Sequence, residues 1–155
     1  MSAEELKTKV ELFGIWFEKR GWQPVAGRIF GYLLLSNPPY HSTEEMQEFL
    51  QISKSSLSTN LKNLMHERVV NYITFPGDRK RYFQIDTENW LKKAKERAND
   101  VSDFAEILNR TLENRSDAED AEFNQALQRV ADFYRHLSDG ISKTVSSWDF
   151  ELNYN

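Results

Sequence analysis

The chain has 155 residues, of which 39% are hydrophobic, and its formal net charge is −4 at pH 7. A chain of this length buries one moderate core, which argues against two independent catalytic domains. It contains no cysteine, so disulfides, thiolate zinc sites and thiol-based redox sensing are excluded. Its apolar runs are too short for a membrane span and its N-terminus is too polar for a signal peptide, so we expect a cytoplasmic protein.

The first predicted helix covers residues 3–20. Ser2 and Glu5 form a capping-box pattern at its start, and Gly21 follows as a natural terminator. Its apolar face comprises Leu6, Val10, Phe13 and Phe17. Trp16 lies beside this face, so we expect the helix to be buried on more than one side, with another subunit as the second partner.

The second predicted helix begins at Pro24 and ends near Ser36, because Asn37-Pro38-Pro39 cannot continue a helix. Gly27 and Gly31 lie four residues apart on one face of it. A phosphate-binding glycine loop would need a preceding strand and a terminal lysine, and this stretch has neither. We therefore expect the two glycines to let another helix approach closely.

A helix-turn-helix is predicted after residue 42. Ser42 and Glu45 form a second capping box that starts a short helix, and a break at residues 51–54 separates it from a longer one. The buried face of the longer helix is predicted to comprise Leu57, Leu61 and Leu64. The opposite face comprises Ser55, Thr59, Lys62 and His66.

A hairpin is predicted next. Residues 71–75 and 81–85 alternate between two faces and flank the turn sequence Pro76-Gly77-Asp78. Tyr40-His41 is expected to add a short third strand, which makes His41 structural rather than a ligand. A helix-turn-helix followed by a hairpin predicts a winged helix, whose second helix enters the major groove and whose hairpin reaches the adjacent backbone or minor groove.

The distribution of charge favours nucleic acid despite the negative total. From Gln51 to Arg81 six basic residues face two acidic ones, whereas from Asn99 onward twelve acidic residues face five basic ones. DNA affinity depends largely on neutralising phosphates. We therefore expect one basic surface that meets DNA and an acidic body that meets protein.

Two motifs carry a resemblance to the MarR family of bacterial transcription regulators. ISKSSLSTNLKNLMHERVV at residues 52–70 is similar to the family's capped recognition helix, and PGDRKR at residues 76–81 is similar to its wing. GRIFGYLLLSNPP at residues 27–39 is similar to the GbsR-like branch, which comprises repressors tied to osmoprotectant metabolism. The resemblance covers most of residues 13–85. Arg68 departs from it, because the family usually has glycine there, so we expect a strained or reshaped turn.

The resemblance also implies roles in the wing. Asp78 is similar to the family residue that braces the turn by pairing with a neighbouring basic residue. Arg79 corresponds to the residue that enters a groove, and Lys80 or Arg81 corresponds to a phosphate contact. Strand alternation leaves the side of Arg81 undecided, so it either contacts phosphate or lies against the hairpin.

In the longer helix, Ser53 is expected to cap the first turn and leave its amides near a phosphate. Lys62 and Asn63 are the better candidates for discriminating bases, although Lys62 equally suits a phosphate. The residues expected at DNA are Ser53, Lys54, Ser55, Ser56, Ser58, Thr59, Lys62 and Asn63 in this helix and Arg79, Lys80 and Arg81 in the wing.

Two long helices are predicted beyond the wing. The first covers residues 88–115, and the second follows a third capping box, Ser116 and Glu119, and extends past Gly140 to Trp148. Their apolar seams cannot be buried within so short a chain, so we expect a homodimer. Its interface is predicted to combine the first helix with these two, burying Phe13, Phe17, Leu108 and Leu137.

The predicted fold is therefore mainly α with a small β-hairpin wing: a winged helix-turn-helix plus a long helical dimerisation region. Residues 1–22 form an N-terminal helix that contributes to dimerisation, 23–86 the DNA-binding domain and 87–155 the C-terminal dimerisation region. We expect a homodimeric regulator, a repressor, that binds a palindromic operator in double-stranded DNA. The rival interpretation is an adaptor that binds proteins through the winged-helix face.

The sequence carries no enzyme signature and predicts no cofactor. An acidic run is interpreted as a solvated helix start rather than a metal site; it comprises Asp117, Glu119, Asp120 and Glu122. Four aromatic residues form either core contacts, the commoner case, or a cage for a quaternary ammonium group: Trp16, Trp22, Tyr40 and Trp90. A small effector is expected between the DNA-binding module and the dimerisation helices.

Overall fold

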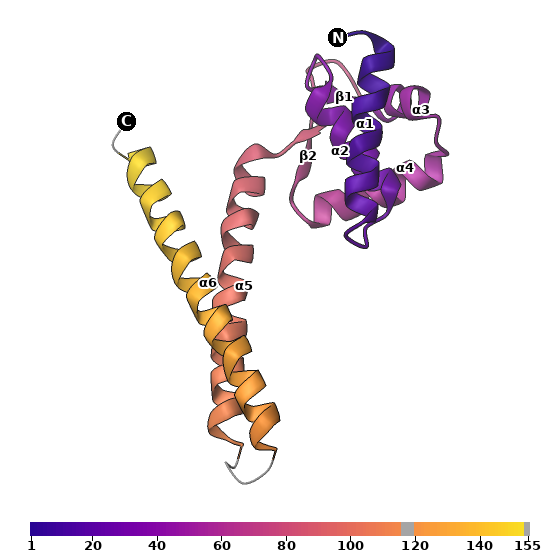
Figure 1. Ribbon diagram of the computed structural model, residues 1–155. Coiled ribbons are helices and arrows are strands. Elements are labelled where there is room, and N and C mark those ends of the chain that lie inside the picture. The colour runs from indigo at the N-terminus through magenta and orange to yellow at the C-terminus, as the bar shows by residue number, and fades with distance from the viewer. Residues whose placement is uncertain (116–119, 154–155) are drawn as a thin grey trace. The chain divides into compact units, whose positions relative to one another are not determined.

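The computed structural model describes residues 1–115 and 120–153, without the side chains of Ala98 and residues 149–153 (Figure 1). Its elements are α1 (Ala3–Glu18), α2 (Pro24–Leu35), β1 (Tyr40–His41), α3 (Thr43–Leu50), α4 (Lys54–His66), β2 (Val70–Ile73), β3 (Tyr82–Ile85), α5 (Thr87–Glu113) and α6 (Ala121–Asn153). Each predicted helix is present, and α6 passes Gly140 as expected. The third predicted capping box, at Ser116 and Glu119, lies outside the described residues.

The chain forms two compact units, Met1–Trp90 and Leu91–Asn155. The first unit holds a three-stranded sheet in the order β1-β3-β2, and both strand pairs are antiparallel. The predicted short strand at Tyr40 and His41 is confirmed, since these residues pair with Gln84 and Phe83. A helix-turn-helix followed by a β-hairpin is a winged helix, so the predicted fold class is confirmed.

Side-chain caps fix where α3 and α4 begin. Ser42 Oγ accepts a bond from the Glu45 amide at 3.3 Å, and the Glu45 carboxylate accepts one from the Ser42 amide at 2.7 Å. The hydrogen bond that the Ser42 backbone amide donates lowers the pKa of the Glu45 carboxyl group. At the other end of α3, Gln51 adopts a left-handed φ of 54°, and Ser53 then caps α4. These caps begin both helices at the residues that the sequence indicates.

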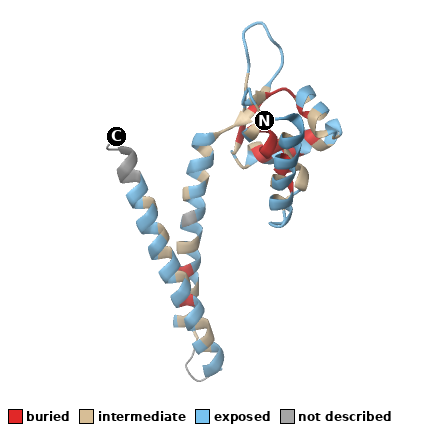
Figure 2. Cartoon of the chain, turned by 45° about the horizontal axis from the view of Figure 1, so that its top comes forward, coloured by how far each residue is buried: buried red, intermediate tan, exposed pale blue. Residues whose placement is uncertain are grey.

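The core of the first unit lies between α1, α2, α3, α4 and the sheet, where Figure 2 shows the buried residues gathered. It comprises Val10, Ala26, Ile29, Tyr32, Leu33, Met46, Leu57, Leu61, Leu64, Val70 and Phe83. Fully burying a side chain of the leucine or isoleucine class contributes about 1.5–3 kcal/mol. The predicted face of the longer helix, with its three leucines, is therefore a principal part of this core.

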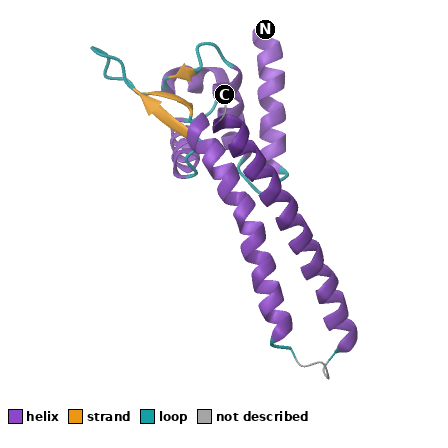
Figure 3. Cartoon of the chain, turned by 90° about the vertical axis from the view of Figure 1, so that its left-hand side faces the viewer, coloured by secondary structure: helices purple, strands orange, loops and turns teal. Residues whose placement is uncertain are grey.

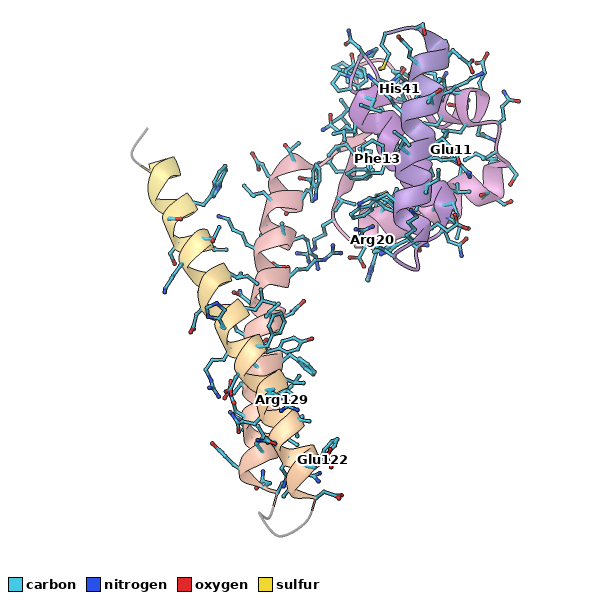
Figure 4. The ribbon with its side chains drawn as sticks, in the orientation of Figure 1. Glu11, Phe13, Arg20, His41, Glu122 and Arg129 are labelled. Atoms are coloured by element: carbon cyan, nitrogen blue, oxygen red, sulfur yellow. The ribbon has the colours of Figure 1, made fainter. Side chains whose placement is uncertain are left out.

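Helices α1 and α2 pack at unusually short range. A Cβ atom at Gly27 would lie 2.5 Å from the Phe13 carbonyl oxygen, and one at Gly31 would lie 2.7 Å from the Phe13 ring. The predicted close approach at these two glycines is confirmed. Glu11, labelled in Figure 4, and Arg28 bridge the same helix pair with two hydrogen bonds of 2.7 and 2.8 Å.

This packing corrects one prediction about α1. Phe13 and Phe17 were expected to require a second subunit, but both are partly buried within their own chain, against Gly31 and Gly27 of α2. Their rings also contact Phe30 at 5.9 and 5.6 Å. The exposed apolar residues of α1 are instead Leu12, Ile15 and Trp16. A periodic apolar stripe shows that a face is buried, but it does not identify the partner.

The hairpin strands are shorter than the predicted runs of 71–75 and 81–85. Strand β2 ends at Ile73 and β3 begins at Tyr82, which leaves an eight-residue loop between them (Figure 3). Pro76 has no amide donor and Gly77 has a φ of 81°, so the chain turns with the Asp78 amide bonded to the Phe75 carbonyl at 3.1 Å. Strand pairing therefore stops before the turn.

The second unit is an antiparallel pair formed by α5 and α6, which lie side by side in Figures 1 and 3. Ala105 and Ala131 are buried, and Ser102 Oγ and Ser138 Oγ lie 2.6 Å apart. Phe104 and Tyr134 add a ring contact at 4.9 Å. The contact between the two helices thus combines small, polar and aromatic side chains, with Ala105 and Ala131 as its buried residues.

Large apolar side chains of this unit remain on its surface. The exposed ones are Leu91, Phe104, Ile107, Phe123, Val130, Phe133, Leu137 and Trp148. Leu108, which was predicted at the dimer interface, is partly buried.

We predict that Gly27→Ala will destabilise the first unit by about 1–3 kcal/mol, because the added methyl group meets the backbone of α1. The matched control is Gly140→Ala, since a Cβ at this helical glycine has open space within 4 Å. The control should be neutral or stabilising by up to about 1 kcal/mol. Urea unfolding of both variants measures the difference, and equal stability of the two would contradict the close packing.

Candidate nucleic-acid interface

Helix α4 turns one face into the core and the other to solvent. Leu57, Leu61 and Leu64 are each no more than 3% exposed, and Asn60 lies beside them at 6%. The exposed residues at or near the opposite face are Ser53, Lys54, Ser55, Ser58, Thr59, Lys62, Asn63 and His66. These side chains are short, polar or basic, and none is a large apolar group. Such a face approaches a groove closely and offers hydroxyl, amide and ammonium groups.

Ser56 differs from the other candidates in α4. It is partly buried, its amide donates to Ser53 Oγ at 3.2 Å and its carbonyl accepts from Asn60 Nδ2 at 2.9 Å. Ser53 Oγ also lies 3.1 Å from Ser55 Oγ. Ser56 therefore closes the first turn of α4, while Ser53 and Ser55 present the exposed hydroxyls.

Helical spacing separates the remaining candidates. Ser55, Thr59 and Lys62 follow one another at intervals of four and three residues, which places them on one stripe. Asn63 lies on the flank of this stripe and Ser58 on the opposite flank. His66 continues the stripe and its side chain is 88% exposed. It was not among the predicted contacts, although its spacing of four residues from Lys62 already indicated this position.

The wing tip is held by Asp78, but not through the predicted basic partner. Its Oδ1 accepts from the Lys80 amide at 2.9 Å and its Oδ2 accepts from the Tyr82 hydroxyl at 2.7 Å. The Lys80 amide, followed by the Tyr82 hydroxyl, lowers the pKa of Asp78, and the bond to Asp78 raises the pKa of Tyr82. The expected brace is present with a tyrosine and a backbone amide in place of a basic side chain.

The loop of the wing is drawn as exposed in Figure 2, and its three basic residues are all exposed. Arg79 and Lys80 follow the turn directly. Arg81 lies back along the hairpin, with its guanidinium carbon 4.6 Å from the centre of the Tyr72 ring. The side of Arg81, which strand alternation left undecided, is therefore the one that carries Tyr72. An arginine stacked on an aromatic ring can still bind phosphate through its free N–H groups.

The four aromatic residues considered as a cage do not share one site: Trp16, Trp22 and Trp90 are linked through Phe17 and Phe30, whereas Tyr40 lies in another cluster. Trp16 and Trp22 contact Phe17, and Trp90 contacts Phe30 at 5.2 Å. Tyr40 instead packs against the wing residues Phe75 and Tyr82 at 5.3 and 5.9 Å. The Trp16 ring is covered by Arg20 at 3.5 Å. These contacts fit the alternative of core and surface packing, and they give no four-ring cage.

His41 is structural, as expected. It is 7% exposed, and its ring nitrogens lie 2.8 Å from Ser36 Oγ and 3.4 Å from the Tyr32 hydroxyl. Among the side chains of residues 1–115 and 120–148 that the structure describes, no cluster of three histidine or carboxylate groups is placed to hold a metal. Asp117 and Glu119 of the acidic run are outside that range. Nor does any described helix have the length and apolar character needed to cross a membrane.

Comparisons with known proteins agree with this architecture. The chain is 26% identical over 149 residues to the HTH-type transcriptional regulator MmpR5 of Mycobacterium tuberculosis, covering 96% of this chain and 90% of that protein. A crystal structure described as a transcriptional regulator shares the fold, with a TM-score of 0.68, 24% identity and coverage of 94% and 98% of the two chains. The S. aureus MepR–DNA complex is less similar, with a TM-score of 0.42, 19% identity and coverage of 82% and 88%. No family model matches.

Arg68 adopts a φ of 58° in the turn after α4, so the strain expected at this position is present. We predict that Arg68→Gly will raise the free energy of unfolding by about 1 kcal/mol, because glycine adopts this conformation without a Cβ clash. The control is Lys9→Gly in the exposed interior of α1, which should lower it by about 1 kcal/mol. Chemical unfolding measures both free energies. Destabilisation by Arg68→Gly would show that the contacts of the arginine side chain stabilise the fold by more than the backbone strain costs.

Proposed function

We propose that this protein is a DNA-binding transcription regulator that acts as a homodimer on a palindromic operator. Each α4 enters the major groove of one half-site, and each wing contacts the adjacent backbone or minor groove. The observation that carries the proposal is the outward face of α4, which is free of large apolar side chains and lies in the same unit as an exposed basic wing. The similarity to MmpR5, named as a transcriptional regulator, supports it.

The roles within the interface follow from side-chain reach and chemistry. The hydroxyls of Ser55 and Thr59 allow close approach but read bases ambiguously. Lys62 lies on the same stripe and suits either a guanine edge or a phosphate. Asn63 offers a donor and an acceptor in one plane, which is the pattern that adenine matches in the major groove. Asn63 is therefore the residue that discriminates bases in this proposal.

The wing supplies charge rather than sequence information. Arg79 extends from the tip and enters the groove, as the resemblance to MarR-type wings implies. Lys80 and Arg81 contact phosphates, and each neutralised phosphate releases counterions from the duplex. The local basic surface thereby overcomes the repulsion between DNA and a chain whose net charge is −4.

The rival function is an adaptor whose winged-helix face binds another protein. Protein interfaces derive most of their affinity from buried aromatic, arginine and other large anchors. On α4 the exposed side chains at the centre of the face are Ser55, Thr59 and Lys62. These residues favour DNA over a protein partner.

A second copy of the chain is the proposed partner of the dimerisation region. The helix pair α5 and α6 buries small residues at its own contact and leaves phenylalanines such as Phe123 and Phe133 at 53% and 61% exposure. Soluble monomers seldom expose so many large apolar groups together. A palindromic operator is also matched by a protein dimer with two-fold symmetry. Exposed Leu12, Ile15 and Trp16 give α1 a surface that can join the same interface.

Three finer parts of the proposal rest on the resemblance alone: repression, membership of the GbsR-like branch and control by a small effector. An effector that changes the separation of the two recognition helices would release the operator, because half-sites lie about 34 Å apart. A screen of melting temperature with choline, betaine and aromatic acids tests for such a ligand.

We predict that Arg79→Ala will weaken binding to every duplex and reduce the magnitude of the slope of log affinity against log salt by about 0.9 per subunit, because one cation that displaces counterions from the duplex is removed. Asn63→Ala should instead relax the preference at one base position by about 1–3 kcal/mol and leave the salt slope unchanged. Fluorescence anisotropy across a salt titration separates the two effects.

The matched control for this experiment is Arg129→Ala, which removes an exposed arginine from the acidic unit (Figure 4). It should bind like the wild type. If Arg79→Ala and Arg129→Ala have the same affinity and slope as the wild type, the wing does not contact DNA.

We predict that Phe133→Glu will raise the dimer dissociation constant by about tenfold or more, because a charge replaces an apolar anchor. Gln125→Glu adds the same charge to the polar face of α6 and should leave the constant unchanged. Sedimentation equilibrium measures both. A wild-type protein that sediments as a monomer at every concentration would remove the dimer from the proposal.

A further inference from the structure

The wing loop depends on very few contacts for its shape. The last paired residues of β2 and β3 before the loop are Ile73 and Tyr82, so residues 74–81 lie outside the sheet. The turn itself is closed by a single backbone bond from Asp78 to Phe75. Ordering a loop that carries three long basic side chains costs conformational entropy at the moment of binding. Any contact that orders this loop in the free protein reduces that cost.

One side chain outside the loop reaches its tip. The Tyr82 hydroxyl, on the first residue of β3, donates to Asp78 Oδ2 at 2.7 Å. The other carboxylate oxygen of Asp78 accepts from the Lys80 amide at 2.9 Å. Asp78 thus links a fixed strand to the backbone between Arg79 and Arg81. We call this chain of two hydrogen bonds the Tyr82–Asp78–Lys80 clamp.

The Tyr82 ring is itself held in place. It contacts Phe75 at 5.2 Å and Tyr40 at 5.9 Å, and Tyr40 contacts Phe75 at 5.3 Å. Tyr40 belongs to β1, which pairs with β3 on the side away from β2. The three rings therefore tie the base of the loop to the third strand, and the direction of the Tyr82 hydroxyl follows from their packing.

Electrostatics alone does not explain the carboxylate at this position. Asp78 places a negative charge beside Arg79 and Lys80, where it opposes the approach of phosphate. An exposed carboxylate that weakens the local positive field needs a compensating role, and its two hydrogen bonds supply a geometric one. The shifts in the pKa of Asp78 and Tyr82 agree with a bonded, ionised carboxylate.

We propose that Tyr82 is a positioning residue for DNA binding: through the Tyr82–Asp78–Lys80 clamp, it sets the wing in its DNA-binding arrangement before DNA arrives. This inference rests on the proposed function, because it assigns a role to the same wing. Tyr82 touches no DNA itself. Its contribution is to reduce the entropy lost when Arg79 and Lys80 are ordered on the duplex.

The test compares Tyr82→Phe with the wild type, because this change removes only the hydroxyl and keeps the ring among Tyr40 and Phe75. Duplex affinity should fall by about three- to tenfold, the effect of one ordinary hydrogen bond at an exposed site. The salt slope should stay unchanged, because no cation is lost. Amide hydrogen exchange at Lys80 in the free protein should become faster, while the melting temperature stays within about 2 °C.

Two further variants control the experiment. In Asp78→Asn the side-chain oxygen can still accept from the Lys80 backbone amide, and the side-chain NH2 group can donate to the Tyr82 hydroxyl oxygen. This variant should therefore retain the wing geometry and bind DNA at least as well as the wild type. Tyr134→Phe removes a tyrosine hydroxyl from α6 and should change neither binding nor exchange at Lys80.

The outcomes separate the two proposals. If the wild type binds DNA and Tyr82→Phe binds equally well with unchanged Lys80 exchange, Tyr82 does not position the wing and the proposed function stands. Faster exchange without any loss of affinity also overturns the positioning role. If the wild type binds no duplex, the proposed function fails and the inference fails with it.

Discussion

Burial of Leu57, Leu61 and Leu64 is the constraint on which the candidate interface depends. Each is almost fully covered, so rotation of α4 about its axis would expose apolar surface at a cost of about 1.5–3 kcal/mol per side chain. The caps at Ser53 and Ser42 fix where α4 and α3 begin. The outward direction of Thr59 and Lys62 is a consequence of these inner contacts. Core packing thereby determines which polar groups meet a partner.

Sequence patterns predicted the elements well because the signals are local. Capping boxes, the glycine spacing of α2 and the leucine spacing of α4 each depend on residues within a few positions of one another. The partner of a buried face is not local information. Phe13 and Phe17 were assigned to a second subunit, whereas Gly27 and Gly31 let α2 cover them. The spacing of the glycines showed that a helix would approach, but not that α1 would.

The sequence predicted which residues form the candidate site better than it predicted the hydrogen bonds and ring contacts among them. The α4 and wing candidates are exposed except Ser56, whose backbone groups close the first turn. The resemblance indicated a brace at Asp78, but the tyrosine that completes it follows from strand register and ring packing. His66 was missed as a candidate although its spacing placed it on the outward stripe. The net charge of −4 alone gives no sign of the basic wing, which becomes evident only when the charges are assigned to their positions along the chain.

Selection from a pool of random duplexes with the purified protein tests the central claim most directly. Two α4 helices related by a two-fold axis should enrich a palindromic consensus with half-sites about one helical turn, or 34 Å, apart. Asn63→Ala, run in the same selection, should lose the preference at one position in each half-site. A selection that enriches no sequence, or one without two-fold symmetry, would contradict the account.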